Sequence, residues 1–432
     1  MRICLTIFAL MLDVCVMAQT SNDVYSITAC PSEDASTGMR ISWAADTTVT
    51  NTFVLVTKEN VQNWRKAQVV RPEQMELCDT FDNAYSILED GTDIYEDAKF
   101  LKCGASIGNL KPDTQYKYVI CAGKNAKKCR QLSTVHHFKT AGASEWSACI
   151  ISDIHTYLPN KVRLASAVDM IGTVKEYDPS MDWVLHLGDL TAWGSSYSFW
   201  RKMYQEQPFE DWMWAGCVGN HDFTTRQNKF NNNFFRDTDY YPRNGYDGEE
   251  GICYWFRYSD ALFLMLNNND MTSEEGLSAA QRWVEKVVTE QKSSSRPPKY
   301  IIVTEHYGWF YSSDGEYFEY TRWHELFDKL GVDLALSGHH HIYTRTGAIF
   351  NDKKTDGSYG TVYMQTSSVD NDRGEKIEDT PMKNADKIEF RFTEGGPTIS
   401  AISMKVSPEG MKFALINRKG MVLDEAFIPA KR

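Results

Sequence analysis

The sequence predicts a β-sandwich domain followed by a larger α/β domain. From about residue 23 to residue 140, short runs alternate between apolar and polar residues, as at Met39, Ile41 and Trp43. This period of two is typical of half-buried strands. Later in the chain, apolar runs alternate with amphipathic stretches, which is typical of parallel strands joined by helices. The chain of 432 residues exceeds the usual size of one domain, and its 42% hydrophobic content is enough for a packed core.

The amino terminus has the features of a secretory signal peptide. Met1 and Arg2 give a basic start, residues 3–12 are apolar, and Ala18 ends a stretch that suits cleavage. We therefore expect a signal peptide at residues 1–18 and a secreted, periplasmic or cell-surface protein. Asp13 interrupts the apolar stretch, so an ordinary amino-terminal tail is the alternative. Elsewhere no run approaches the roughly 18 apolar residues of a membrane span, and no transmembrane segment is expected.

The predicted sandwich domain spans residues 22–140. Its segment Leu110–Tyr116 resembles the fibronectin type III signature, in which the tyrosine can form a corner hydrogen bond. Residues 57–103 form a longer and more polar stretch than such a domain needs, so we expect an inserted loop or an extra hairpin there. Cys121 and Cys129 flank a turn-like sequence and could face each other across a hairpin, but one sequence does not fix how cysteines pair.

The α/β domain is expected at residues 146–430, after a small and flexible linker at residues 141–144. Its buried strands are predicted from five apolar runs, Ala148–Ser152, Trp183–Leu187, Met213–Val218, Tyr300–Thr304 and Val332–Ser337. The amphipathic stretches Lys161–Glu176 and Thr321–Leu330 read as crossover helices, so the strands should be parallel and their carboxyl ends should meet. Alternating runs at residues 360–365, 401–406, 411–417 and 421–427 are expected to complete a second sheet that packs on the first.

A short polar motif follows each of the five predicted strands. The motifs are Asp153-Ile154-His155, Gly188-Asp189, Gly219-Asn220-His221-Asp222, Glu305-His306 and Gly338-His339-His340-His341. Each motif alone is weak evidence, but their joint order is strong. Two divalent cations about 3.5–4 Å apart need imidazoles, carboxylates and one oxygen that bridges them.

Asp189 is the natural bridge between two such metals. The other predicted ligands are Asp153, His155 and His341 for the first metal, and Asn220, His306 and His339 for the second. The set contains nitrogen and oxygen donors and no thiolate, so it suits iron, manganese or zinc better than calcium. The sequence does not choose among these three metals.

The ordered motifs resemble those of the calcineurin-like metallophosphoesterases, and within them those of the purple acid phosphatase branch. Val303-x-x-His306 and Gly219-Asn220-His221 carry this resemblance, and Leu264–Asn267 followed by Gln281–Val284 is similar to a strand end and helix start of that branch. The resemblance covers most of the chain. It implies a catalytic domain built as a four-layer α/β/β/α sandwich, with a fibronectin type III-like domain in front of it.

The resemblance also implies a reaction, in which hydroxide held between two metals attacks phosphorus, because two cations lower the pKa of a bound water. His221 directly follows Asn220 and is assigned as the general acid for the departing alkoxide. Asp222 either holds His221 in the right tautomer or caps the turn. Asn220, His221 and Arg226 are candidate substrate contacts, although Arg226 lies in a polar segment, residues 223–250, for which a solvated loop is the alternative.

For other residues near the motifs, a structural role is the simpler interpretation. His186 lies inside a predicted strand, and His340, between two ligands, is expected to face solvent. Trp193 and Trp309 each follow a ligand motif and either stack on a leaving group or pack in the core.

We expect an exported, acid-phosphatase-like phosphomonoesterase that acts on small phosphoesters. A phosphodiesterase for nucleotides or lipid head groups uses the same metals and is the nearest alternative. A catalytically inert surface binding protein is an alternative of another class, although a decayed site would be expected to have lost ligands. The net charge of -12 and the lack of a basic stripe argue against a nucleic-acid-binding scaffold. The oligomeric state stays open.

The metal-loaded protein is predicted not to be purple. The purple enzymes carry a glycine two residues after the first aspartate and a metal-binding tyrosine three residues after the second, where this chain has His155 and Ala192. An imidazole at the first position can take the coordination place that the tyrosinate would fill. A visible absorption spectrum of the metal-loaded protein tests this, and a phenolate-to-iron charge-transfer band would contradict it.

Overall fold

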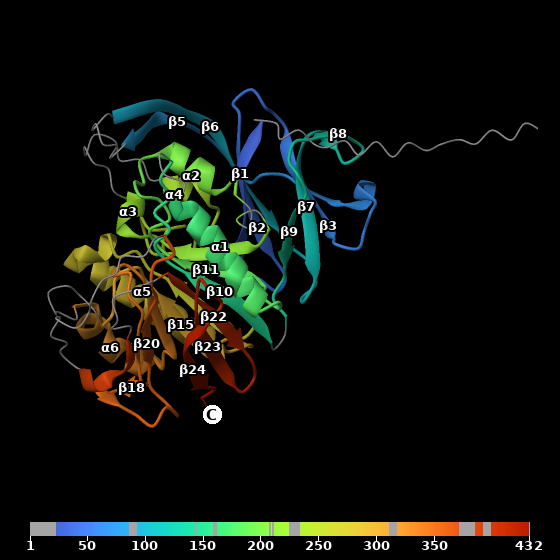
Figure 1. Ribbon diagram of the computed structural model, residues 1–432. Helices are drawn as coiled ribbons and strands as arrows, with labels where there is room; N and C mark the ends of the chain where they lie inside the picture. The colour runs from blue at the N-terminus through green and yellow to red at the C-terminus, as the bar shows by residue number, and fades with distance from the viewer. Residues whose placement is uncertain are drawn as a thin grey trace, which may run out of the picture.

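The computed structural model describes residues 23–85, 93–142, 145–158, 162–206, 209, 211–223, 234–310, 318–370, 385–391 and 399–431 (Figure 1). The expected signal peptide and Arg226 lie outside these residues. Two large sheets and one smaller sheet form the framework. Within the described ranges, no helix is both long enough and apolar enough to cross a membrane.

The largest sheet has ten strands and runs through both predicted domains. In spatial order its strands are β24 (Val422–Pro429), β23 (Gly410–Asn417), β22 (Ser400–Val406), β10 (Trp146–Ile151), β11 (Trp183–Leu187), β12 (Met213–Cys217), β1 (Val24–Pro31), β2 (Met39–Ala45), β6 (Asp93–Ile107) and β5 (Gln74–Tyr85). β10, β11 and β12 are parallel, as predicted. β1 pairs in parallel with β12, with Ala29 opposite Met213, so strands of the amino-terminal region extend the sheet of the α/β domain.

The second sheet has seven strands. In spatial order they are β13 (Tyr254–Tyr258), β14 (Ala261–Met265), β15 (Tyr300–Thr304), β16 (Leu334–Ser337), β20 (Val362–Gln365), β17 (Thr344–Thr346) and β21 (Ile388–Arg391). β14, β15, β16 and β20 are parallel to one another. The predicted strands Trp183–Leu187 and Tyr300–Thr304 are confirmed with the same bounds, as β11 and β15.

The carboxyl-terminal strands join a different sheet from the one expected. Of the four late runs, only the first lies in the second sheet, as β20, while β22, β23 and β24 extend the first sheet. β22 pairs antiparallel with β10, with Trp146 opposite Val406. This pairing satisfies the backbone N–H and C=O groups along the outer edge of β10. The expectation that all four runs complete the second sheet was therefore wrong.

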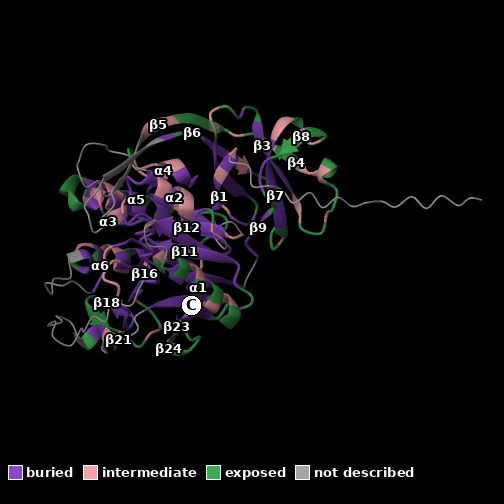
Figure 2. Cartoon of the chain, turned by 45° about the horizontal axis from the view of Figure 1, so that its top comes forward, coloured by how far each residue is buried: buried purple, intermediate pink, exposed green. Residues whose placement is uncertain are grey.

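Helices cover the outer faces of the two large sheets. α1 (Val162–Tyr177) contacts β10 and β22, and α5 (Glu274–Lys292) packs with α6 (Phe318–Leu330) on the second sheet. Along β14, Leu262 and Leu264 pack in the cluster under α5 and α6, whereas Phe263 belongs to the core between the sheets. The predicted four-layer α/β/β/α architecture is confirmed, and Figure 2 shows its buried strands in the middle of the molecule.

The remaining helices and short elements are α2 (Tyr197–Met203), α3 (Asn220–Phe223), α4 (Phe234–Thr238), the 3-10 turns η1 (Trp64–Lys66), η2 (Asp270–Thr272) and η3 (Ala385–Lys387), and the hairpin β18 (Ile349–Phe350) and β19 (Lys353–Lys354).

Aromatic side chains hold the two large sheets face to face. Trp183 of the first sheet lies 5.1 Å from Tyr258 and 5.3 Å from Phe263 of the second, measured between ring centroids. Trp146 contacts Tyr258 edge to face at 5.0 Å. Edge-to-face pairs of this kind add specific geometry to a large burial of apolar area. The relative position of the two sheets is therefore fixed by a cluster of bulky rings.

The amino-terminal region contributes the smaller sheet, which faces strands of the largest one. Its strands are β4 (Gln68–Val70), β3 (Thr52–Lys58), β7 (Gln115–Asn125) and β8 (Lys128–Gln131), with β9 (His136–Lys139) paired to β7. The predicted β-sandwich is confirmed, and the backbone N–H of Lys111 donates the expected corner hydrogen bond to the Tyr116 hydroxyl at 2.9 Å. The extra hairpin within residues 57–103 is formed by β5 and β6. Cys121 and Cys129 lie on the paired strands β7 and β8.

His186 has a packing role inside β11. Its register partner on β12 is Gly216, where a Cβ would lie 2.2 Å from the imidazole, so only glycine leaves room for the ring. The ring is buried, and its Nε2 lies 3.2 Å from the Tyr241 hydroxyl. Burial lowers the pKa of His186 from 6.5 to about 3. The folded protein therefore keeps this side chain neutral.

A neutral buried histidine makes the free energy of unfolding depend on pH. Between the unfolded pKa of 6.5 and the folded value of about 3, only the unfolded chain binds this proton, so stability falls as pH falls. The contribution of one group is at most about 1.4 kcal/mol per pH unit. We predict that His186→Gln shows a shallower decline than the wild type in denaturant titrations from pH 6 to pH 5. Equal slopes for the two proteins would contradict the assignment.

Candidate metal centre

The predicted ligands follow strands of both large sheets. By position they are Asp153 and His155 after β10, Asp189 after β11, Asn220 after β12, His306 after β15, and His339 and His341 after β16. Carboxyl ends of neighbouring parallel strands meet at one edge of a sheet, where open α/β folds place their sites. Because the two sheets pack face to face, these edges bring the ligands of both sheets together.

Several of these ligands stand on strained turns. The φ angles are 58° at Asp153, 45° at His155, 54° at Asp189, 74° at His339 and 61° at His341. Positive φ is uncommon for residues other than glycine, and such strain gathers at functional sites. Gly188, with φ of 91°, has a further constraint, because a Cβ there would lie 2.5 Å from Nδ1 of His306. The backbone conformation at the strand ends is thus specialised for holding side chains inward.

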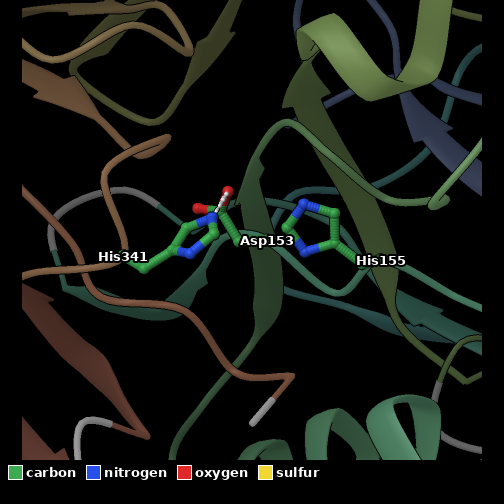
Figure 3. Close-up of side chains that lie close together, drawn as sticks. All are labelled: Asp153, His155 and His341. Atoms are coloured by element: carbon green, nitrogen blue, oxygen red, sulfur yellow. Dashed lines mark ion pairs between the residues drawn. The ribbon is translucent and has the colours of Figure 1, made fainter. Parts of the chain in front are cut away.

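The first group of predicted ligands consists of Asp153, His155 and His341. The ligand atoms of these three residues all lie within 4.8 Å of one another. Nε2 of His341 lies 3.1 Å from Oδ1 of Asp153, and Figure 3 shows both imidazoles beside this carboxylate. Asp153 and His155 are buried, at 0% and 3% exposure. The group offers two nitrogens and a carboxylate oxygen to one cation.

The second group consists of Asp189, His306 and His339, whose ligand atoms also lie within 4.8 Å of one another. Nε2 of His306 lies 3.1 Å from Oδ2 of Asp189, and Nδ1 of His339 lies 3.3 Å from Nε2 of His306. Nδ1–H of His306 donates to the carbonyl of Leu187 at 2.6 Å, which leaves Nε2 as its ligand atom.

One oxygen of Asp189 connects the two groups. Oδ2 lies 3.1 Å from Nε2 of His306 and 3.2 Å from Nε2 of His155. The same atom therefore neighbours an imidazole of each group. This is the position that a bridging carboxylate oxygen would have between two cations.

His221 and Asn220 lie beside the same carboxylate. The backbone N–H of His221 donates to Oδ1 of Asp189 at 2.8 Å, and its Nδ1–H donates to the carbonyl of Ala192 at 2.9 Å. The Nε2 atom is therefore left for the site. A ligand atom of His221 also lies within 4.8 Å of those of His155 and Asp189, so the geometry suits a metal ligand as well as an acid. Asn220 is the first residue of α3 and lies between Gly219 and His221 in the chain.

Asp222 acts on the backbone and not on the His221 ring. Its Oδ1 accepts from the N–H of Thr191 at 3.1 Å, and its Oδ2 accepts from the N–H of Gly219 at 2.9 Å. The tautomer of His221 is set by Ala192 instead. Of the two roles considered from the sequence, the structure favours the cap of the turn. Asp222 is a positioning residue that ties the loop after β11 to the loop after β12, and its assignment as catalytic is corrected.

Asp370 is a functional residue that the sequence motifs miss. Its Oδ2 lies 3.2 Å from Nδ1 of His155, and the side chain is fully buried. Ligating histidines commonly have a carboxylate on the far ring nitrogen, which orients the ring and raises its basicity. Asp370 stands more than 200 residues from His155 along the chain and belongs to no motif, so no sequence signal pointed to it.

Asn268 holds the loop that carries His306. Its Oδ1 accepts from the backbone N–H groups of His306 at 2.6 Å and Tyr307 at 2.8 Å, and its Nδ2 donates to Glu305 at 2.6 Å. The sequence contains a signal for this role, since three consecutive asparagines, Asn267 to Asn269, come directly after the apolar residues Leu264 to Leu266.

Charge coupling at the site is strong when no cation is bound. Burial alone would lower the pKa of His155, but hydrogen bonds with Asp189 and Asp370 raise it to about 10. Burial would also lower the pKa of His306, but the negative charge of Asp189 raises it to about 9. Burial would raise the pKa of Asp189, yet His306 and His155 hold it well below 3.8. Burial and the charge of His306 lower the pKa of His339 to about 3.

These side chains fit a pair of metal ions. Protonated imidazoles compensate the buried carboxylates at the positions that cations would take, and bound cations would displace those protons. The donors are imidazole nitrogens and carboxylate oxygens, which suits iron, manganese or zinc. The metal identities stay open, as in the sequence analysis.

The remaining residues of interest divide between core and site. Trp309 is 1% exposed and packs in the core under α5 and α6, so its leaving-group role is not supported. Trp193 is only partly buried and lies near His221, with 5.9 Å between ring centroids. Ala192 packs in a small apolar cluster with Phe199. His340 is partly exposed, and its ring lies 4.6 Å from that of His339.

Two family models match successive parts of the chain. The family model of calcineurin-like phosphoesterases matches residues 148–343, and that of the purple acid phosphatase N-terminal domain matches residues 24–140. No curated protein sequence matches the chain.

Two solved structures share the fold. A purple acid phosphatase isolated from seeds of yellow lupin (Lupinus luteus) has a TM-score of 0.72 and 15% identity, over 95% of this chain and 75% of that one. The structure of PhoD has a TM-score of 0.57 and 12% identity, over 95% of this chain and 90% of that one. At such identities the likeness concerns the fold alone. The matched models show that the chain carries a calcineurin-like metallophosphoesterase domain behind a purple acid phosphatase N-terminal domain, and the grouped His and Asp side chains lie in the first of these.

Proposed function

We propose that this metallophosphoesterase is a dinuclear phosphomonoesterase in which Asp189 bridges the two metals and His221 is the general acid. The observation that carries the proposal is the place of Asp189 Oδ2, at 3.2 Å from His155 and 3.1 Å from His306. Two cations bound there would polarise the phosphoryl oxygens and lower the pKa of a water nucleophile.

The protein's own residues supply orientation and a proton. The Ala192 carbonyl fixes the His221 ring through Nδ1, so His221 can hold a proton at Nε2 and deliver it to the oxygen of the leaving group. Asp222 keeps the two loops that carry Asp189 and His221 in register. Asp370 and Asn268 orient His155 and the His306 loop. Asn220 and His221 are the proposed substrate contacts among the described residues.

The proposed place of action is outside the cytoplasm. The support for it is the basic and then apolar segment at residues 1–18, which has the features of a secretory signal. The proposed substrates are small phosphoesters, because the acidic chain lacks the basic stripe of a nucleic-acid binder.

Loss of the bridging ligand should remove both metal and activity. We expect Asp189→Asn and His306→Ala to lower kcat by more than about 100-fold, since even residues that only orient a metal ligand contribute about 10–100-fold. Metal content measured by elemental analysis should fall in both variants. Asp356→Asn changes an exposed carboxylate away from the site and serves as the matched control. Unchanged activity in both site variants would refute the assigned centre.

Removal of the proposed acid should depend on the leaving group. His221→Ala is expected to lower kcat by about 10²–10⁴-fold for an alkyl phosphate, whose alkoxide needs a proton to depart. The loss should be much smaller for 4-nitrophenyl phosphate, which releases a stable phenolate, and the metal content should stay at the wild-type level. Equal losses on both esters, or the loss of a metal, would make His221 a ligand instead.

Ester preference tests the substrate class directly. A phosphomonoesterase should turn over 4-nitrophenyl phosphate faster than bis(4-nitrophenyl) phosphate under the same conditions. A strong preference for the bis ester would replace the proposed monoesterase with a phosphodiesterase that keeps the same metals.

A further inference from the structure

We propose that Trp193, Tyr157 and Leu158, together called the aromatic wall, bind the leaving group of an aromatic phosphoester. The inference rests on the proposed function, because it takes His221 as the acid at the leaving-group oxygen. It adds a substrate class to that function, namely monoesters whose alcohol carries an aromatic ring.

The aromatic wall is a small cluster with a buried base and a partly exposed rim. Ala192 and Phe199 form the base, at 5% and 2% exposure, and the three wall residues pack against them while remaining only partly buried. The cluster is separate from the two larger apolar clusters, one of which spans both domains while the other lies under α5 and α6. Apolar surface that stays accessible beside a reaction centre is a common feature of ligand sites.

Backbone contacts hold the two loops of the aromatic wall side by side. Thr156 and Thr191 form a parallel bridge between the loops that follow β10 and β11. The N–H of Ala192 donates to the carbonyl of Thr156 at 3.1 Å. These contacts place the loop of Tyr157 and Leu158 beside the loop of Trp193, and all three side chains pack on the same base.

The aromatic wall is also fixed relative to the proposed acid. The N–H of Gly194 donates to the carbonyl of His221 at 2.8 Å, and Nδ1–H of His221 donates to the carbonyl of Ala192 at 2.9 Å. These two bonds bracket Trp193 in the chain. The ring centroids of Trp193 and His221 are 5.9 Å apart, with 56° between the planes. A group whose oxygen is protonated by His221 therefore departs beside the Trp193 ring.

Chemistry favours an aromatic occupant over a polar one. The wall side chains present an indole, a phenol ring and a leucine, on which a planar ring can pack with large apolar contact. A sugar or polyol would turn most of its hydroxyl groups toward the ring faces and the leucine, which offer them no hydrogen bonds, so its binding there costs free energy. Tyr307, another partly buried ring at the centre, lies 4.6 Å from the His339 ring at an interplanar angle of 47°, and so lies beside the second group of ligands.

The experiment compares benzyl phosphate with propyl phosphate, whose leaving alcohols are similarly weak acids. The metal-loaded full-length protein and its variants Trp193→Ala and Trp193→Phe are assayed on both esters. Trp193→Ala should lower kcat/KM for benzyl phosphate by about 10-fold and change that for propyl phosphate by less than about 2-fold, as expected for loss of one ring contact. Trp193→Phe should keep most of the preference. Trp64→Ala removes a partly buried tryptophan of η1 in the amino-terminal region and should leave both values unchanged.

Each other outcome has a distinct meaning. Equal losses on the two esters in Trp193→Ala would show that Trp193 only supports the His221 loop, which overturns the leaving-group site and leaves the phosphomonoesterase in place. A wild type that prefers propyl phosphate would overturn it as well. Hydrolysis of neither ester by the metal-loaded wild type would instead refute the proposed function on which the inference rests.

Discussion

Asp189 places one carboxylate oxygen between imidazoles that come from opposite sheets. His155 follows β10 of the first sheet and His306 follows β15 of the second, and both contact Oδ2 within 3.2 Å. The centre therefore exists only while the two sheets hold their relative position. Trp146, Trp183 and their aromatic partners between the sheets hold that position. The geometry of the site therefore depends on the packing of the core between the sheets.

The local backbone is adapted to the same carboxylate. Left-handed turns at the strand ends direct the ligands inward, and such conformations persist only where surrounding bonds determine them. Asp222 provides two of those bonds by joining the loops after β11 and β12, and Asn268 provides others around His306. Asp370 lies 3.2 Å from the far ring nitrogen of His155 and so orients that imidazole. The residues around the predicted ligands thus account for how these turns keep their left-handed conformation.

Sequence reasoning succeeded where a local pattern carries the information. The bounds of β11 and β15 agree with the sequence, and each polar motif follows its strand, so the four-layer fold and the gathering of the Asp and His side chains could be predicted. The pairing of strands distant in the chain depends on which sheet edges are left unpaired after the sheets pack. For this reason β22 pairs with β10 of the first sheet, although the sequence predicts that it joins the second. Contacts between distant parts of the chain are equally hard to predict. Asp370 belongs to no motif, so the sequence does not connect it with His155. The sequence likewise does not show that Asp222 accepts a hydrogen bond from Thr191, because the two residues lie in different loops.

The central claim is that Asp189 bridges two metal ions. Anomalous diffraction from crystals of the metal-loaded protein tests it most directly. The account predicts two anomalous peaks about 3.5–4 Å apart, with an oxygen of Asp189 between them, His155 at one and His306 at the other. A single peak, or two peaks without Asp189 between them, would contradict the account.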